Sequence, residues 1–180
     1  MSLERGGIPE KMIAIHEHLR TAGIAHAFGG ALALAWCTQQ ARGTIDVDVN
    51  IFVGPDRADD SLAALPGGVV ATDEERALLL RDGQARLWWG ITPVDVFLNT
   101  TEFHERVATR VRWEPFADAV LPFLACDDLA VFKAFFNRTK DWADLEAMRE
   151  AGALNVSAVA GVLATFLGGD DDRIARLLLL

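Results

Sequence analysis

The sequence predicts an α/β (α+β) fold with a small, mixed, twisted β-sheet flanked by helices and followed by a C-terminal helical segment. A strand, a helix and a second strand follow one another within residues 24–53, which is an α/β unit. Further strand patterns lie between residues 86 and 125. Only helical patterns follow, so we expect an α/β core over residues 1–126 and a helical segment over residues 127–180 packed on that core.

The first part of the chain alternates helical and strand patterns. Apolar residues recur at helical spacing over residues 9–22, and Gly23 follows where a helix C-cap is expected. Residues 24–28 then predict a short strand, residues 30–40 an apolar helix and residues 44–53 an alternating strand.

The second part contains acid-led helices and apolar strands. Residues 86–98 predict two strands around Gly90, and prolines in the later strand patterns favour outer positions in the sheet. The expected helices are residues 56–65, 73–83, 101–110, 127–137, 140–151, 155–168 and 170–180, and the expected outer strands are residues 111–116 and 119–125.

The charge of the chain argues against binding to long nucleic acids. The 180 residues include 26 acidic and 17 basic side chains, which give a formal net charge of -9. No Lys/Arg cluster is present that could neutralise a row of phosphates. A small anionic ligand bound through a metal ion stays compatible with this composition, because a divalent cation reverses the local charge of an acidic site.

The cysteines and apolar runs indicate a cytoplasmic protein that does not enter a membrane. Cys37 and Cys126 have neither CxxC nor Cys/His spacing, so we expect free thiols. The charged N-terminal stretch lacks the apolar core of a signal peptide, and no apolar run is long enough to span a bilayer. The apolar run from Leu177 to Leu180 predicts packing on the domain or on a second subunit of a homodimer.

Three isolated carboxylates lie in apolar strands. Asp46 and Asp48 are two residues apart and point to one face of their strand, with Cα atoms roughly 6.5 to 7 Å apart. Asp95 stands between Val94 and Val96 in a later strand. Like charges so placed repel or bind a cation, and Mg²⁺ takes carboxylate oxygens together with substrate phosphates. The alternative is an edge strand that carries aspartate against aggregation.

Gly29 and Gly30 lie at the turn from a strand into a helix. Backbone N–H groups are free at such a turn, and the helix dipole favours an anion such as phosphate. Tight turns also need glycine for steric reasons alone, so both interpretations stay open.

These motifs together resemble the nucleotidyltransferase superfamily typified by DNA polymerase beta. The resemblance is closest to the minimal and abortive-infection-toxin types, in which a Gly-Gly pair precedes R-x-T-x-D-x-D and a third acid follows on a later strand. It extends to residues 128–148, where a helix with a lysine precedes a Lys-Asp segment, and it covers roughly residues 24–150. The quoted motifs are Gly29-Gly30, Arg42-Gly43-Thr44, Asp46-Val47-Asp48 and Val94-Asp95-Val96.

The resemblance implies a role for each motif residue. Asp46, Asp48 and Asp95 would be the catalytic residues and would bind one or two Mg²⁺ ions, with Asp95 completing the site or acting as general base. The nucleotide-binding residues would be Gly29, Gly30, Arg42, Thr44, Lys133 and Lys140, with Arg42 and Thr44 either touching the nucleotide or positioning the first strand. Lys140 and the adjacent Asp141 can equally cap a helix.

The implied reaction is attack by an acceptor hydroxyl on the α-phosphate of a nucleoside triphosphate such as ATP. The acceptor would be a small molecule or a protein, and tRNA is disfavoured by the acidity of the chain. A second hypothesis is a non-catalytic interaction module of toxin-antitoxin type that keeps the fold; the presence of all three acids and both glycines favours the enzyme.

Overall fold

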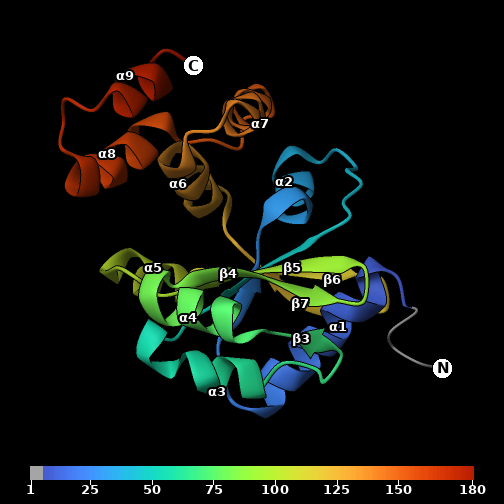
Figure 1. Cartoon of the computed structure of the whole chain (residues 1–180). Coiled ribbons are helices and arrows are strands. Elements are labelled where there is room, and N and C mark those ends of the chain that lie inside the picture. The colour runs from blue at the N-terminus through green and yellow to red at the C-terminus, as the bar shows by residue number, and fades with distance from the viewer. Residues whose placement is uncertain (1–5) are drawn as a thin grey trace. The chain divides into compact units, whose positions relative to one another are not determined.

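A mixed β-sheet forms the framework of the first of two units in the computed structural model, which describes residues 6–180. This unit comprises the chain up to Gly29 together with Gly43–Phe123, and the second unit comprises Gly30–Arg42 with Leu124–Leu180 (Figure 1). The N-terminal stretch whose charge argues against a signal peptide lies partly in residues 1–5, outside the described residues.

The sheet has both parallel and antiparallel pairs, as the predicted fold class requires. β2 pairs with β5 and β1 with β7 in parallel, and the other neighbours are antiparallel. In spatial order the strands are β3 (Val69–Val70), β4 (Gln84–Trp89), β5 (Thr92–Leu98), β2 (Val47–Ile51), β1 (His26–Phe28), β7 (Ala119–Phe123) and β6 (Arg112–Phe116).

β2 is the middle strand of this sheet, with β5 on one side and β1 on the other. The interpretation of its aspartates as protection of an edge strand is therefore wrong. Of the two strands expected at the outside, only β6 is an edge, because β7 pairs with β1 as well as with β6.

Helices of the first unit cover one face of the sheet, where α1, α3 and α4 lie along it (Figure 1). Alternate residues of the inner strands supply the buried apolar side chains of this face, including Val49, Val96 and Leu87. α1 contributes an apolar stripe at helical spacing. The helical elements of this unit are α1 (Ile8–Thr21), η2 (Pro55–Arg57), α3 (Ala58–Ala63), α4 (Asp73–Asp82) and α5 (Glu102–Ala108).

β2 begins later than the alternation of residues 44–53 predicts. Thr44 explains the difference, because its Oγ1 accepts a hydrogen bond from the Asp46 backbone N–H at 3.3 Å and lies 3.1 Å from the Asp46 backbone carbonyl oxygen. Such local side-chain bonds compete with the strand ladder. Asp46 therefore precedes the strand, whereas Asp48 lies within it.

The second unit is helical and joins two distant parts of the chain. It contains α2 (Gly30–Thr38), α6 (Cys126–Phe136), α7 (Thr139–Glu150), α8 (Val156–Leu167) and α9 (Asp172–Leu178). In α9, Leu177 is buried, whereas Leu178 and the following Leu179 are exposed. None of the helices in residues 6–180 combines the length and apolar character needed to cross a membrane.

A disulfide within this unit corrects the expectation of free thiols. Cys37 of α2 and Cys126 of α6 are bonded, with their Cα atoms 5.6 Å apart. The two cysteines lie 89 positions apart in the chain, so no local spacing motif could indicate the pairing. Packing of α2 beside α6 brings the two residues together.

His16 and His26 form a buried pair in the first unit. The Nδ1 of His26 lies 3.0 Å from the Ile24 carbonyl, which can only accept, so this nitrogen donates. Neutral His26 then accepts through Nε2 from His16 Nδ1 at 2.9 Å. Burial lowers the pKa of both rings, that of His26 to about 4. His26 thus has a hydrogen-bonding role within the fold.

This pair predicts a loss of stability in acid. Because the folded chain holds His26 below its ordinary pKa of 6.5, the unfolded chain binds more protons as the pH falls from 6.5 to about 4. The lowered pKa of His26 corresponds to a loss of roughly 3 kcal/mol over that window. Urea unfolding between pH 7.5 and pH 4 measures the fall; His26→Gln should flatten it, and the exposed His18→Gln should not. An equal slope in all three proteins would contradict the assignment.

The disulfide predicts that reductant destabilises the chain. A cross-link that closes a loop of this length stabilises the folded chain by roughly 4.5 kcal/mol in the chain-entropy model, because it lowers the entropy of the unfolded state. Urea unfolding with and without a phosphine reductant measures the difference, and a thiol reagent should label the native chain only after reduction. The Cys37→Ser variant serves as control, because its unfolding midpoint should not respond to reductant. A midpoint equally insensitive in the wild type would contradict the bond.

Candidate active site

The two central strands of the sheet place Asp48 and Asp95 side by side. β2 and β5 run parallel with Asp48 opposite Asp95, and the flanking valines Val47, Val49 and Val96 point to the buried face. Cross-strand neighbours of a sheet lie about 5 Å apart. Two carboxylates from distant parts of the sequence therefore share one face, which is not the face that holds the apolar core.

Asp46 lies just before β2, and Thr44 holds its side chain. Thr44 Oγ1 donates to Asp46 Oδ1 at 2.5 Å. The Asp46 side chain is 30% exposed. A short charge-assisted hydrogen bond of this kind fixes the orientation of the carboxylate. Thr44, predicted to contact the nucleotide or support the strand, contacts Asp46 in this structure.

Arg86 joins this carboxylate group and was not singled out by the sequence. It lies on β4 directly opposite Asp95. Its Nε and Nη2 donate to the two oxygens of Asp95, each at 2.7 Å, and Nη2 lies 3.7 Å from Asp46 Oδ2. The pKa of Arg86 is raised above its ordinary value by the hydrogen bond to Asp95 and by attraction to Asp95, Asp46 and Asp48. We call Asp46, Asp48, Asp95 and Arg86 the carboxylate cluster.

Gly29 extends the same row of residues, because its N–H donates to the Asp48 carbonyl at 2.9 Å. This amide is therefore engaged in the sheet, contrary to the expectation that it is free to receive an anion. Gly30 begins α2 with a φ of 58°. That left-handed conformation favours glycine and accounts for the second glycine of the pair.

The donor chemistry of the carboxylate cluster fits Mg²⁺. Carboxylate oxygens are the hard ligands that this ion prefers, and the Arg86 guanidinium shows that Asp46 and Asp95 already face one positive charge. Within residues 6–180 no group of three or more acidic, histidine or cysteine side chains is assembled closely enough to hold a metal. The three aspartates are thus not assembled as a metal site in this structure, and Asp46 and Asp95 instead share Arg86 as their partner.

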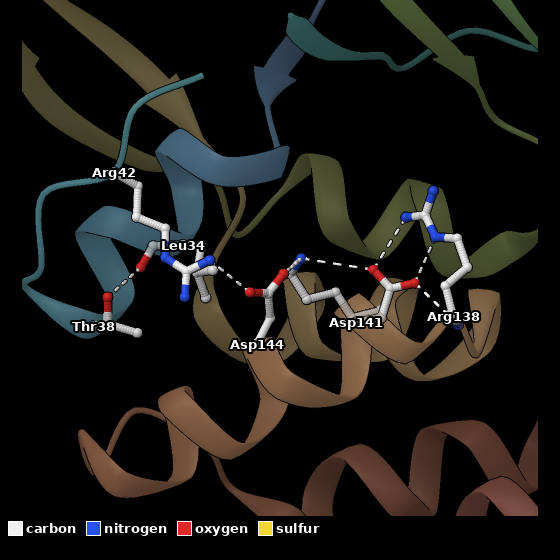
Figure 2. A network of polar contacts seen from close by, with 7 residues as sticks. Leu34, Thr38, Arg42, Arg138, Asp141 and Asp144 are labelled. Carbon is white, nitrogen blue, oxygen red and sulfur yellow. Dashed lines mark hydrogen bonds and ion pairs between the residues drawn. The ribbon is translucent and has the colours of Figure 1, made fainter. Parts of the chain in front are cut away.

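The second unit contains another chain of charged contacts, shown in Figure 2. Asp144 accepts from Arg42 Nη1 at 2.8 Å and from Lys133 Nζ at 2.7 Å. Lys133 also lies 3.9 Å from Asp141, which accepts from the Arg138 side chain and backbone. We call these five residues the helical ion network. It brings together two predicted nucleotide-binding residues, Arg42 and Lys133.

Asp141 and Lys133 are the most deeply buried members of this network. The side chain of Asp141 is 1% exposed and that of Lys133 is 10% exposed, so both charges depend on their partners for stabilisation. Asp141 also caps the start of α7 through the Arg138 N–H, as the capping interpretation of this segment predicts. Lys140 is exposed in the first turn of α7.

The sequence contains a hairpin pattern from which the pairing of Arg86 with Asp95 could have been predicted. β4 and β5 form a hairpin in which Trp89 pairs with Thr92 across a loop of Gly90 and Ile91. Gly90 has a φ of 61°, the left-handed conformation that tight hairpin loops use. Counting outward from this loop pairs Arg86 with Asp95, so a hairpin register would have found the ion pair.

Comparison with known proteins identifies the fold. The solution structure of the antibiotic-resistance factor ANT(2'')-Ia matches with a TM-score of 0.56 and 12% identity, over 94% of this chain and 88% of that one. A crystal structure of an antigenic nucleotidyltransferase-like protein from Paracoccidioides brasiliensis matches with a TM-score of 0.48 and 12% identity, over 94% of this chain and 91% of that one. No protein-family model matches the sequence, and no curated protein matches it. The chain has a nucleotidyltransferase-like fold.

The helical ion network predicts a large loss of stability when Asp141 is removed. Asp141→Ala leaves the nearly buried Lys133 with Asp144 alone and takes away the cap of α7, which should cost roughly 3 kcal/mol. Urea unfolding measures the change. Glu146→Ala is the matched control, because Glu146 is an exposed acid on the same helix and its loss should change stability by less than about 0.5 kcal/mol. Equal effects of the two substitutions would contradict the structural role of Asp141.

Proposed function

We propose that this protein is a Mg²⁺-dependent nucleotidyltransferase that moves a nucleoside monophosphate from a nucleoside triphosphate to a hydroxyl of an acceptor. One observation carries the proposal: the pairing of β2 with β5 makes Asp48 and Asp95 neighbours beside Asp46. The nucleotidyltransferase-like fold supports it at a coarser level. Fold alone does not determine activity, so the carboxylate cluster is the specific argument.

In this proposal Asp46, Asp48 and Asp95 hold one or two Mg²⁺ ions. The bound ion supplies positive charge against the triphosphate and the leaving pyrophosphate. Thr44 keeps the Asp46 carboxylate in place through its hydrogen bond. Asp95 accepts the proton of the acceptor hydroxyl, or completes the metal site, after its pair with Arg86 opens. In phosphoryl transfer, a protein catalyses mainly by positioning the reactants and by stabilising negative charge.

The nucleotide is proposed to contact Gly29, Gly30, Arg42, Thr44, Lys133 and Lys140. Arg42 and Lys133 both donate to Asp144 in this structure. A phosphate group that used either cation would replace Asp144 as its partner, and guanidinium and ammonium groups serve both kinds of oxyanion. Lys140 is exposed, so a phosphate could reach it without replacing Asp144.

The acceptor is proposed to be a small molecule or a protein hydroxyl. The fold shared with an antibiotic-resistance factor makes a small-molecule acceptor the first to test. A tRNA acceptor is less favoured, since a net charge of -9 opposes an extended contact with phosphates.

A second candidate function is a non-catalytic interaction module of toxin-antitoxin type. The ion pair of Arg86 with Asp95 favours it, because this contact gives Asp95 a partner of opposite charge without any ligand. The two candidates differ in whether the carboxylate cluster binds nucleotide and metal.

Calorimetric titration with each of the four nucleoside triphosphates, with and without Mg²⁺, tests the proposal. We expect Mg²⁺-dependent binding of at least one nucleotide, and Asp48→Asn should weaken it by roughly a hundredfold because one ligand of the ion is lost. Asp118→Asn is the matched control, since Asp118 is exposed in the turn between β6 and β7.

Either of two results would reject the transferase. One is the absence of nucleotide binding by folded protein at millimolar concentration, which would favour the interaction module. The other is binding that Asp48→Asn and Asp118→Asn leave equally unchanged. Where binding is found, release of pyrophosphate in the presence of candidate hydroxyl acceptors measures the reaction itself.

A further inference from the structure

Arg86 lies at the end of a cross-strand row that contains two aspartates of the carboxylate cluster. Asp48 on β2, Asp95 on β5 and Arg86 on β4 are successive cross-strand neighbours. Cross-strand neighbours share a face, so the guanidinium completes a row that begins with two carboxylates. Without it, adjacent negative charges on the two inner strands would repel one another.

The chemistry of this contact makes Arg86 a substitute for a bound cation. Its two parallel hydrogen bonds take both oxygens of Asp95, and the same guanidinium lies within ion-pair distance of Asp46. Arginine stays charged throughout the physiological pH range, so the pair opens by movement of the side chain and not by loss of a proton. Coordination of Asp95 to a metal needs the oxygens that Arg86 holds.

Burial differs on the two sides of the contact. The Arg86 side chain is 52% exposed and that of Asp95 is 17% exposed. The carboxylate is thus fixed in the sheet, whereas the long arginine side chain has room to move into solvent or toward a ligand. Exposed ion pairs are weak compared with metal coordination or with a bidentate contact to phosphate.

We propose that Arg86 is a positioning residue that holds Asp95 and Asp46 as an internal counter-cation, competes with a divalent metal ion for them, and transfers to the polyphosphate of the nucleotide when the ion binds. This inference rests on the proposed nucleotidyltransferase function. It assigns to one side chain opposite effects on two ligands: Arg86 opposes Mg²⁺ when the ion binds alone, and it favours nucleotide when both are present.

Titration of the full-length chain tests both effects. Mg²⁺ alone, and then a nucleoside triphosphate analogue with a non-hydrolysable α,β linkage in saturating Mg²⁺, are titrated into the wild type, Arg86→Met and Arg86→Lys. We expect Arg86→Met to bind Mg²⁺ roughly tenfold more tightly and the analogue roughly tenfold more weakly than the wild type, a typical strength for coupled ligands. Arg86→Lys keeps the charge without the bidentate geometry, and should restore part of the analogue affinity.

A matched control removes the same kind of contact elsewhere. In the last turn of α4, Arg81 makes a bidentate pair with Asp82 at 2.8 and 2.6 Å. Arg81→Met should leave both affinities as in the wild type. Combining Arg86→Met with Asp95→Asn should abolish the gain in Mg²⁺ affinity, because the oxygens that Arg86 releases are then altered.

The outcomes separate this inference from the function on which it rests. If Arg86→Met leaves the affinity for Mg²⁺ unchanged or lower, while Asp48→Asn still abolishes metal-dependent nucleotide binding, the role of Arg86 is rejected and the transferase stands. If Asp48→Asn has no effect on either ligand, the proposed function is rejected as well. Tighter Mg²⁺ binding with unchanged analogue binding rejects the transfer of Arg86 to phosphate.

Discussion

The parallel register of β2 against β5 is the constraint on which the rest of the first unit depends. A slip of one residue would move Asp48 to the face that holds Val47 and Val49 and would expose those valines. Burial of apolar side chains on one face therefore fixes the carboxylates on the other. The folding free energy of the sheet and the geometry of the candidate site come from the same pairing.

Each unit contains charged side chains that need partners, and the two units supply those partners in different ways. In the first unit the requirement falls on an exposed arginine, because Arg86 partners Asp95 across the hairpin. In the second unit Asp141 and Lys133 are nearly buried, so their network involves more than one partner for each charge. Charges that lie away from water need such partners. The arginine of the first pair is half exposed, whereas the buried network stabilises a helix junction.

Much of the sheet was predictable, because strands and helices leave different hydrophobic periods in the sequence. Asp46, Asp48 and Asp95 stood out as lone acids in apolar strands, and their proximity followed once β2 and β5 were neighbours. Strand order is a tertiary property, so the sequence did not exclude an edge position for β2. The cysteine pair depends on the packing of α2 beside α6, which no local pattern encodes. The contact of Arg86 with Asp95 could have been predicted, since the hairpin around Gly90 places these two residues opposite one another.

The energetics of the carboxylate cluster bear on the choice between the two candidate functions. Adjacent aspartates on inner strands reduce the stability of a sheet, and one half-exposed arginine offsets that cost only in part. Asparagine at position 48 would remove the repulsion, whereas asparagine at position 95 would also remove the carboxylate with which Arg86 pairs. Positive charge brought by a ligand would relieve the same repulsion, which is the role that the proposed function gives to Mg²⁺. The two candidate functions therefore differ in what supplies the positive charge, which is a bound cation in the transferase and Arg86 alone in the interaction module.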